Sequence, residues 1–151
     1  MRSLLIALLL IVSPLAQAWN AAGHRLAAHI AWQQLSPASQ AFIADALARH
    51  PDHQRWADKA RSAAPADIFA EASTWPDDIR NDPRFHDDER EPTAALPGFP
   101  DMARHKRWHY VDLDSKGKVS DGEVDRQIER LEHLLRSTAK KDQISYLLPW
   151  L

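Results

Sequence analysis

The sequence contains no cysteine, so packing and any bound metal must stabilise the fold without disulfide bonds. It also lacks an excess of positive charge. The formal net charge is −2 with histidine neutral, which excludes a polycationic nucleic-acid binder. No apolar run approaches the roughly 20 residues that a membrane-spanning helix needs, and no internal repeat is present. What remains is a chain of 151 residues, enough for one domain with a modest hydrophobic core.

The first 18 residues have the layout of a secretory signal peptide. Arg2 precedes an apolar run over residues 4–12, and Ala16-Gln17-Ala18 forms a leader-peptidase site. We therefore expect an exported protein, periplasmic or extracellular, whose domain begins at Trp19. No cysteine follows the leader, so a lipid anchor is not expected.

Cleavage after Ala18 would create a metal ligand at the new amino terminus. A free α-amine has a pKa of about 7.7–8.0, so it deprotonates at modest cost and can chelate a metal together with the Trp19 carbonyl oxygen. His24, five residues further on, could bind the same ion. The alternative is that Trp19 packs in the core and His24 is an ordinary helix residue.

Helical patterns dominate the chain after the leader, and the fold is expected to be mainly α. Ser36-Pro37 supplies an N-cap and a proline at the first position of the second helix, in which Phe42 and Leu47 are expected to face the core. His50 and His105 show no pattern and are expected to be exposed. The predicted helices cover residues 22–35, 37–50, 66–74, 122–138 and 144–151.

Two segments are predicted to be non-helical. Residues 81–104 are rich in proline, aspartate and arginine with little apolar periodicity, which predicts a long irregular surface loop. Residues 108–112 form the one clearly extended segment, and strand alternation places His109 opposite Trp108 and Tyr110.

Two carboxylates and a guanidinium follow the third predicted helix, at Asp77, Asp78 and Arg80. Aspartate can ligate a hard or borderline cation, and arginine can bind phosphate oxygens. The alternative is a capped turn with an exposed ion pair, which contributes about 0–1 kcal/mol.

The extended segment carries a second set of candidate functional residues. His109 could face a metal, Tyr110 could offer a ring on which a nucleobase stacks, and Asp112 could accept a hydrogen bond from a base amino group. The alternative is a buried, hydrogen-bonded histidine beside a core tyrosine.

Residues 112–123 nearly match a calcium-binding loop. Acidic residues occupy positions 1 and 3, glycine position 6 and glutamate position 12. Lys116, however, stands at the fifth position, where an oxygen ligand belongs, and an extended segment enters the loop instead of a helix. A secreted calcium-binding helical module remains the non-enzymatic alternative.

Taken together, Trp19-x4-His24, residues 74–80 (TWPDDIR) and residues 108–112 (WHYVD) resemble the zinc-dependent single-strand nucleases of the S1/P1 type. The resemblance implies the helical fold that these nucleases share with bacterial zinc phospholipase C. It also implies three zinc ions that activate water to attack phosphorus and stabilise the leaving 3′ oxygen. The expected substrates are single-stranded DNA and RNA and 3′-nucleotides, cleaved to 5′-phosphorylated products, and no protein partner is predicted.

The resemblance assigns roles to individual residues. Trp19 and His24 would bind one zinc ion, and Asp77 and His109 another. Asp77 is thereby also catalytic, and Arg80 would bind the scissile phosphate.

Two further positions match the substrate side of the family's site. Tyr110 would stack against a base and Asp112 would contact its edge. Asp78 is expected to lie behind the ligands.

The family's pattern continues with a His-x3-Asp motif and a His-Gln-Pro-Leu-His run, which this sequence lacks. The resemblance therefore covers the N-terminal part of the domain, residues 19–151, and the chain as given is expected to be an inactive, truncated fragment with too few ligands per zinc. Its apolar end, including Leu147 and Trp150, is expected to be exposed. A zinc phospholipase C-like phosphodiesterase is the alternative within the same fold.

Overall fold

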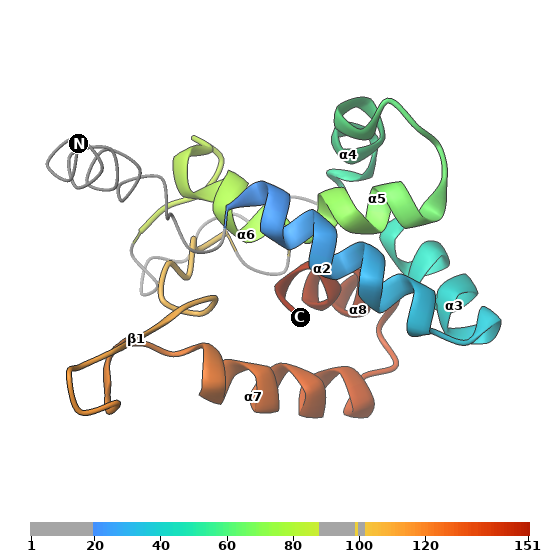
Figure 1. Ribbon diagram of the computed structural model, residues 1–151. Coiled ribbons are helices and arrows are strands. Elements are labelled where there is room, and N and C mark those ends of the chain that lie inside the picture. The colour runs from blue at the N-terminus through green and yellow to red at the C-terminus, as the bar shows by residue number, and fades with distance from the viewer. Residues whose placement is uncertain (1–19, 88–98, 100–101) are drawn as a thin grey trace, which may run out of the picture.

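The computed structural model describes residues 20–87, 99 and 102–151, which form a mainly α-helical fold (Figure 1). The predicted fold class is thus confirmed, while Trp19 and the predicted signal peptide lie outside the described residues. No helix among these residues is long and apolar enough to cross a membrane. The elements, with η for a 3-10 helix, are α2 (Ala21–Gln34), α3 (Pro37–Leu47), α4 (His53–Ala60), α5 (Pro65–Ala72), α6 (Trp75–Asp78), η2 (Ile79–Asn81), β1 (Val111–Leu113), β2 (Val119–Gly122), α7 (Val124–Ser137), α8 (Lys141–Leu147) and η3 (Leu148–Trp150).

Side-chain caps define where the first two helices begin. The Asn20 Oδ1 atom accepts the N–H groups of Ala22 and Gly23, each at 3.1 Å, and starts α2. Ser36 Oγ accepts the Ser39 N–H at 3.1 Å and starts α3 at Pro37, as predicted. These caps satisfy N–H groups that have no partner within the helix.

Helix α5 packs against α2, α3 and α4. Arg25 in α2 donates two hydrogen bonds to the buried carboxylate of Glu71 in α5, at 2.6 and 2.9 Å. A two-pronged pair of this kind constrains orientation as well as distance. It therefore places the neighbouring residue, His24, relative to the end of α5.

An aromatic cluster forms the centre of the core around Trp75, whose side chain is 1% exposed. The rings of Phe85, Phe99, Tyr146 and Trp150 lie 5.4–6.2 Å from the Trp75 ring, and three of the four meet it edge-on. Each such pair adds about 0.5–1.5 kcal/mol beyond the area it buries. Trp75 is the first residue of α6, so this packing joins α6 to the C-terminal helices.

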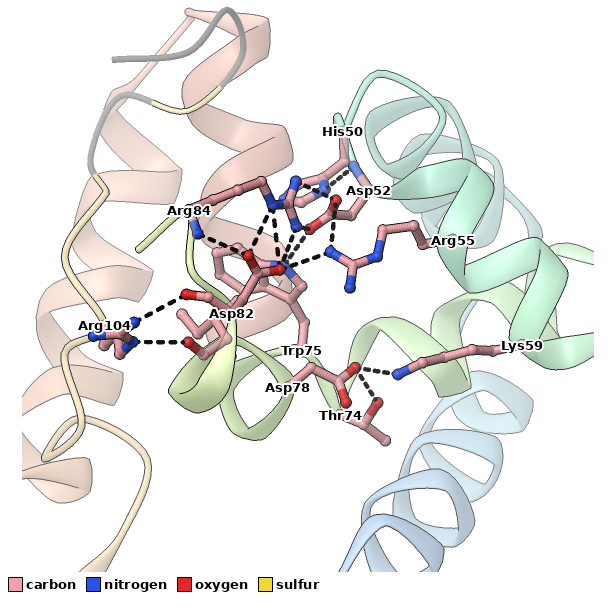
Figure 2. Close-up of polar contacts among 11 residues, drawn as sticks. His50, Asp52, Arg55, Lys59, Thr74, Trp75, Asp78, Asp82, Arg84 and Arg104 are labelled. Atoms are coloured by element: carbon pink, nitrogen blue, oxygen red, sulfur yellow. Dashed lines mark hydrogen bonds and ion pairs between the residues drawn. The ribbon is translucent and has the colours of Figure 1, made fainter. Parts of the chain in front are cut away.

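A network of charged residues contacts the Trp75 side chain (Figure 2). The buried carboxylate of Asp52 accepts bonds from Arg84 at 2.8 and 3.0 Å and from the Trp75 indole at 2.8 Å. Arg84 and Arg55 also donate to Asp82, each at 2.8 Å. Burial alone would raise the pKa of Asp52, but the bonds from Arg84 and Trp75 outweigh it and the pKa is lowered. The network therefore keeps the carboxylates of Asp52 and Asp82 charged next to Trp75, the first residue of α6.

The two strands form an antiparallel hairpin that pairs Val111 with Gly122 and Asp112 with Asp121. Helix α7 follows directly and runs along the lower edge in Figure 1, and it contacts α8. Helix α8 also contacts α3, so the C-terminal helices close against the first half of the fold.

The prediction that residues 81–104 form a surface loop is wrong for the part of this segment that the structure describes. Phe85, Phe99, Met102 and Ala103 are buried in the core, and His86 bridges to Ala103. Aromatic side chains that fill gaps around Trp75 need no regular spacing, so periodicity did not reveal them. Helix α4 was also missed.

Several burial predictions are also wrong. Phe42 is 50% exposed, whereas His50 and His105 are 3% and 6% exposed. The two histidines stack on tryptophans, His50 on Trp56 and His105 on Trp108, because an imidazole can serve as a flat core ring.

The apolar C-terminal end is largely buried as well. Leu147 and Trp150 lie in the core, against the prediction that they would be exposed, and Leu151 is exposed. The tight turn of η3 after α8 brings the Trp150 ring back against Trp75 and Trp108.

Candidate active site

A cleft of about 500 Å³ brings the described candidate residues together. Its walls come from α2, from the α6–η2 turn and from the segment that enters the hairpin. The lining residues are His24, Asp77, Arg80, Lys106, His109, Tyr110 and Asp112. Six of these seven were singled out in the sequence, and Lys106 was not.

The α6–η2 turn presents Asp77 to the cleft and turns Asp78 away from it. Pro76 lies in the first turn of α6, where its missing N–H costs nothing. Asp78 instead pairs with Lys59 and accepts the Thr74 hydroxyl at 3.3 Å (Figure 2). The turn thus separates the two carboxylates, and Asp78 lies behind Asp77.

Arg104 also fixes the α6–η2 turn, through bonds to its backbone. Its guanidinium donates to the backbone carbonyls of Ile79 at 3.2 Å and Asp82 at 3.0 Å (Figure 2). These are carbonyls at the end of a short helix, which have few partners within it. The backbone of this turn is therefore fixed by a side chain that is distant in the sequence.

Asp77 lies between two histidines. One carboxylate oxygen is 3.3 Å from His24 Nε2, and the other is 3.1 Å from His109 Nε2. The family resemblance implied that His24 and His109 bind different zinc ions, and the structure shows that Asp77 faces both histidines. A carboxylate in this position can serve either ion.

Arg80 also contacts His109. Its Nη2 atom is 2.8 Å from His109 Nε2, and its Nε atom is 3.4 Å from an Asp77 carboxylate oxygen. A guanidinium can only donate and a carboxylate can only accept, so one ring nitrogen of His109 cannot satisfy both neighbours. Which of the two neighbours it satisfies depends on the tautomer of His109.

Burial and the nearby Arg80 guanidinium lower the pKa of His109, which is therefore neutral near pH 7. Neutral imidazole is the form that binds metals. The Nδ1 atom of His109 is buried and finds no hydrogen-bond partner within the described part of the chain.

The donor set fits zinc in kind. Zinc binds histidine nitrogen and carboxylate oxygen at about 2.0–2.2 Å, which puts two tetrahedral ligands about 3.3–3.6 Å apart, close to the distances around Asp77. Over residues 20–87, 99 and 102–151, however, no group of three or more histidine, cysteine, aspartate or glutamate side chains is arranged to hold a metal. A further donor is needed, and Trp19 lies outside the described residues.

Tyr110 and Asp112 form the wall beyond the histidine. Alternation predicted that His109 and Tyr110 point in opposite directions, but residues 106–109 form turns and β1 begins at Val111, so both side chains line the cleft. The Tyr110 hydroxyl donates to Asp121 at 2.8 Å, and this bond raises the pKa of Tyr110.

Lys106 and Asp121 are the residues that the sequence analysis missed. Lys106 lines the cleft and donates to Asp87 at 2.9 Å. Its spacing of three residues before His109 is a weak signal. Asp121 could be found only by pairing the two strands of the hairpin.

The same hairpin argues against the calcium loop. Residues 112–123 form two paired strands and a turn in which Asp114 Oδ1 accepts the N–H groups of Lys116 and Lys118, at 2.8 and 2.9 Å. A helix does not enter this segment, as a helix–loop–helix calcium site requires.

Comparison with known proteins identifies the family. The S1/P1 nuclease family model matches residues 19–150. The chain belongs to the S1/P1 nuclease family. Searches of curated proteins and of solved structures found no match. Membership of a nuclease family implies that the substrate is nucleic acid and that the reaction is phosphodiester hydrolysis.

Proposed function

We propose that this S1/P1 family member has the site of an exported zinc-dependent endonuclease and 3′-nucleotidase, which hydrolyses phosphodiester bonds of single-stranded DNA and RNA to 5′-phosphorylated products. The described residues supply fewer zinc donors than a complete cluster needs, so we expect the chain as given to be inactive. The observation that carries the proposal is the position of Asp77 between the Nε2 atoms of His24 and His109, beside Arg80, in an open cleft.

His24, Asp77 and His109 would hold zinc, with the Trp19 amine and carbonyl as further donors and a cluster of three ions in all. Zinc supplies an activated water and neutralises charge on the leaving oxygen. The described side chains supply two nitrogens and one carboxylate, fewer donors than a complete cluster needs. Zinc content is therefore the first quantity to measure.

The remaining cleft residues would bind and orient the substrate. Arg80 can donate two parallel hydrogen bonds to phosphate oxygens, and Lys106 adds a second local positive charge. These two residues supply the attraction that a net charge of −2 cannot. Tyr110 would stack on a base and Asp112 would accept from a base amino group.

Zinc titration of the chain and of two variants tests the proposal. His24→Ala and His109→Ala should each weaken zinc binding by more than the roughly 10- to 100-fold that loss of a supporting residue costs. His133→Ala, at an exposed position on α7, is the control and should bind zinc as the parent does. Equal zinc affinity in all four proteins would refute the site.

Incubation of single-stranded oligonucleotides with the zinc-loaded chain tests both the reaction and the expected inactivity, and any cleavage would contradict the inactivity. Mass spectrometry of the products distinguishes 5′-phosphate from 3′-phosphate ends. Products with 3′-phosphates would contradict the proposal, and faster cleavage of duplex than of single strands would contradict the single-strand preference.

Export can be tested on protein purified from its source. An intact mass that begins at Trp19 would support both export and a free terminal amine at the site. A mass that retains residues 1–18 would remove that amine from the ligand set.

One observation favours the phospholipase C-like alternative. An apolar groove of about 370 Å³ adjoins the cleft, shares His24 and His109 with it, and is otherwise lined mainly by α2, α5, α7 and the C-terminal segment. Such a groove could accept an acyl chain. Release of phosphocholine from phosphatidylcholine vesicles, without cleavage of oligonucleotides, would favour this alternative.

A further inference from the structure

Tyr110 is held at both of its ends by the segment from Asp121 to Val124. Its carbonyl oxygen accepts the N–H groups of Glu123 at 3.0 Å and Val124 at 3.1 Å, at the start of α7. Its hydroxyl donates to Asp121 at 2.8 Å. One short segment thus contacts the backbone and the tip of the same residue.

Gly122 makes this close contact possible. Its φ is +81°, and a Cβ atom at this position would lie 2.2 Å from the Tyr110 carbonyl oxygen. No residue with a side chain fits there without displacing the backbone of Tyr110. The hairpin is therefore built so that β2 lies directly against Tyr110.

Asp121 is in turn held by Arg107. The guanidinium pairs with Asp121 at 2.9 Å and with Glu123 at 3.4 Å. The Arg107 carbonyl also accepts the Glu123 N–H at 2.8 Å. The acceptor of the Tyr110 hydroxyl is thus itself fixed by a second set of contacts.

We propose that Asp121 is a positioning residue that fixes the Tyr110 ring as a preformed stacking surface for a substrate base. The inference rests on the proposed function, in which Tyr110 stacks on a base. A ring that is ordered before the substrate arrives loses less conformational freedom on binding, which is worth about 2- to 10-fold in affinity for one side chain. Asp121 acts through Tyr110 and does not line the cleft.

The test compares two ligands that differ by the base, adenosine 5′-monophosphate and ribose 5-phosphate, bound to the zinc-loaded protein. The ratio of their affinities isolates the contribution of the base. Tyr110→Ala should abolish the preference for the nucleotide. Asp121→Ala and Tyr110→Phe should each lower the ratio by about 2- to 10-fold, with ribose 5-phosphate unaffected.

Three further variants separate positioning from a general structural effect. The double variant of Tyr110→Phe and Asp121→Ala should be no worse than either single one, because both remove the same bond. Asp121→Asn keeps an acceptor oxygen and should retain most of the preference. Glu129→Ala, at an exposed acidic position on α7, should leave both affinities unchanged.

A measurement without ligand tests the bond independently. The chain has two tyrosines, Tyr110 and the buried Tyr146. In NMR relaxation of labelled rings, Asp121→Ala should increase the mobility of Tyr110 and leave Tyr146 as the reference.

The outcomes distinguish failure of the proposed function from failure of the positioning role of Asp121. If neither ligand binds the zinc-loaded protein, the proposed function fails, and ring mobility still reports on Asp121. If the parent prefers the nucleotide and Tyr110→Ala removes that preference while Asp121→Ala does not, the positioning role alone is overturned. Equal weakening of both ligands by Asp121→Ala would likewise overturn it in favour of a structural role.

Discussion

Asp52 accepts a hydrogen bond from the indole nitrogen of Trp75 at 2.8 Å, and both side chains are almost completely buried. Asp77 follows Trp75 by two residues on α6. The bond thus links Asp52, which lies outside the cleft, to the turn that presents the Asp77 carboxylate to the cleft. Stability of the core and geometry of the site are coupled through this pair.

Asp52→Ala should therefore destabilise the protein strongly. The substitution leaves the Trp75 N–H without its acceptor and takes from Arg84 two of its bonds. Leaving a hydrogen-bonding group without its buried partner costs about 1–3 kcal/mol, and Arg84, whose side chain is 30% exposed, keeps its bonds to Asp82. Urea unfolding would measure the loss, with Asp58→Ala, at an exposed position on α4, as control. A loss no larger than that of the control would contradict the role of the pair.

His50 should make stability depend on pH. Burial lowers its pKa from 6.5 to about 4, against the smaller opposing effect of Asp52, and its Nδ1 accepts the Asp52 N–H at 3.0 Å. Between these two pKa values the unfolded chain binds a proton that the folded chain does not. Stability is therefore full above about pH 6.5 and falls as the pH drops toward 4, by about 2–3 kcal/mol.

Unfolding free energies measured near neutral pH and at about pH 4.5 check this dependence. Carboxylates also titrate in this range, so the informative quantity is the difference between the parent and His50→Phe, which keeps a flat ring on Trp56. The variant should lose less stability on acidification. Identical losses in the two proteins would show that His50 does not titrate as inferred.

The site residues that the sequence predicted lie in short local motifs. Asp77 and Arg80 share one turn, and His109, Tyr110 and Asp112 share another segment, so these short motifs together could carry the family resemblance that assigned the residue roles. The first two helices were likewise predictable because Ser36-Pro37 and the alanine-rich pattern act locally.

The features that were missed depend on contacts between distant segments. Asp52 and Arg84 are 32 residues apart, and neither has a local pattern that marks it as buried. Asp121 reaches Tyr110 only through the register of the hairpin. The position of Asp77 between His24 and His109 likewise follows from tertiary packing of α2 on α5, which no single motif contains.

Arg80→Ala should weaken binding of inorganic phosphate to the zinc-loaded protein. Hydrogen bonds from a charged donor contribute about 1.5–3 kcal/mol, so the affinity should fall by about 10- to 100-fold. Arg80→Lys keeps the charge but loses the planar pair of donors, so its phosphate affinity should lie between those of the parent and Arg80→Ala. Isothermal titration with phosphate measures these values.

The control for this prediction is Arg136→Ala, near the end of α7, where the side chain is largely exposed. It changes the net charge equally and lies outside the cleft lining. If Arg80→Ala weakens phosphate binding no more than Arg136→Ala does, general electrostatics explain the effect and Arg80 does not contact the phosphate.

Gly122→Ala and Gly117→Ala form a matched pair that separates backbone strain from steric conflict at the hairpin. Both glycines have positive φ, +81° and +76°, and a side chain in this region costs about 1–2 kcal/mol. A Cβ at Gly117 would meet nothing within 4 Å, whereas one at Gly122 would overlap the Tyr110 carbonyl oxygen. Gly122→Ala should therefore cost more unfolding free energy and also reduce the affinity ratio between adenosine 5′-monophosphate and ribose 5-phosphate. Gly117→Ala should leave that ratio unchanged, because the turn lies away from Tyr110. Equal effects of the two substitutions on stability and on the ratio would mean that close contact between β2 and Tyr110 does not shape the cleft.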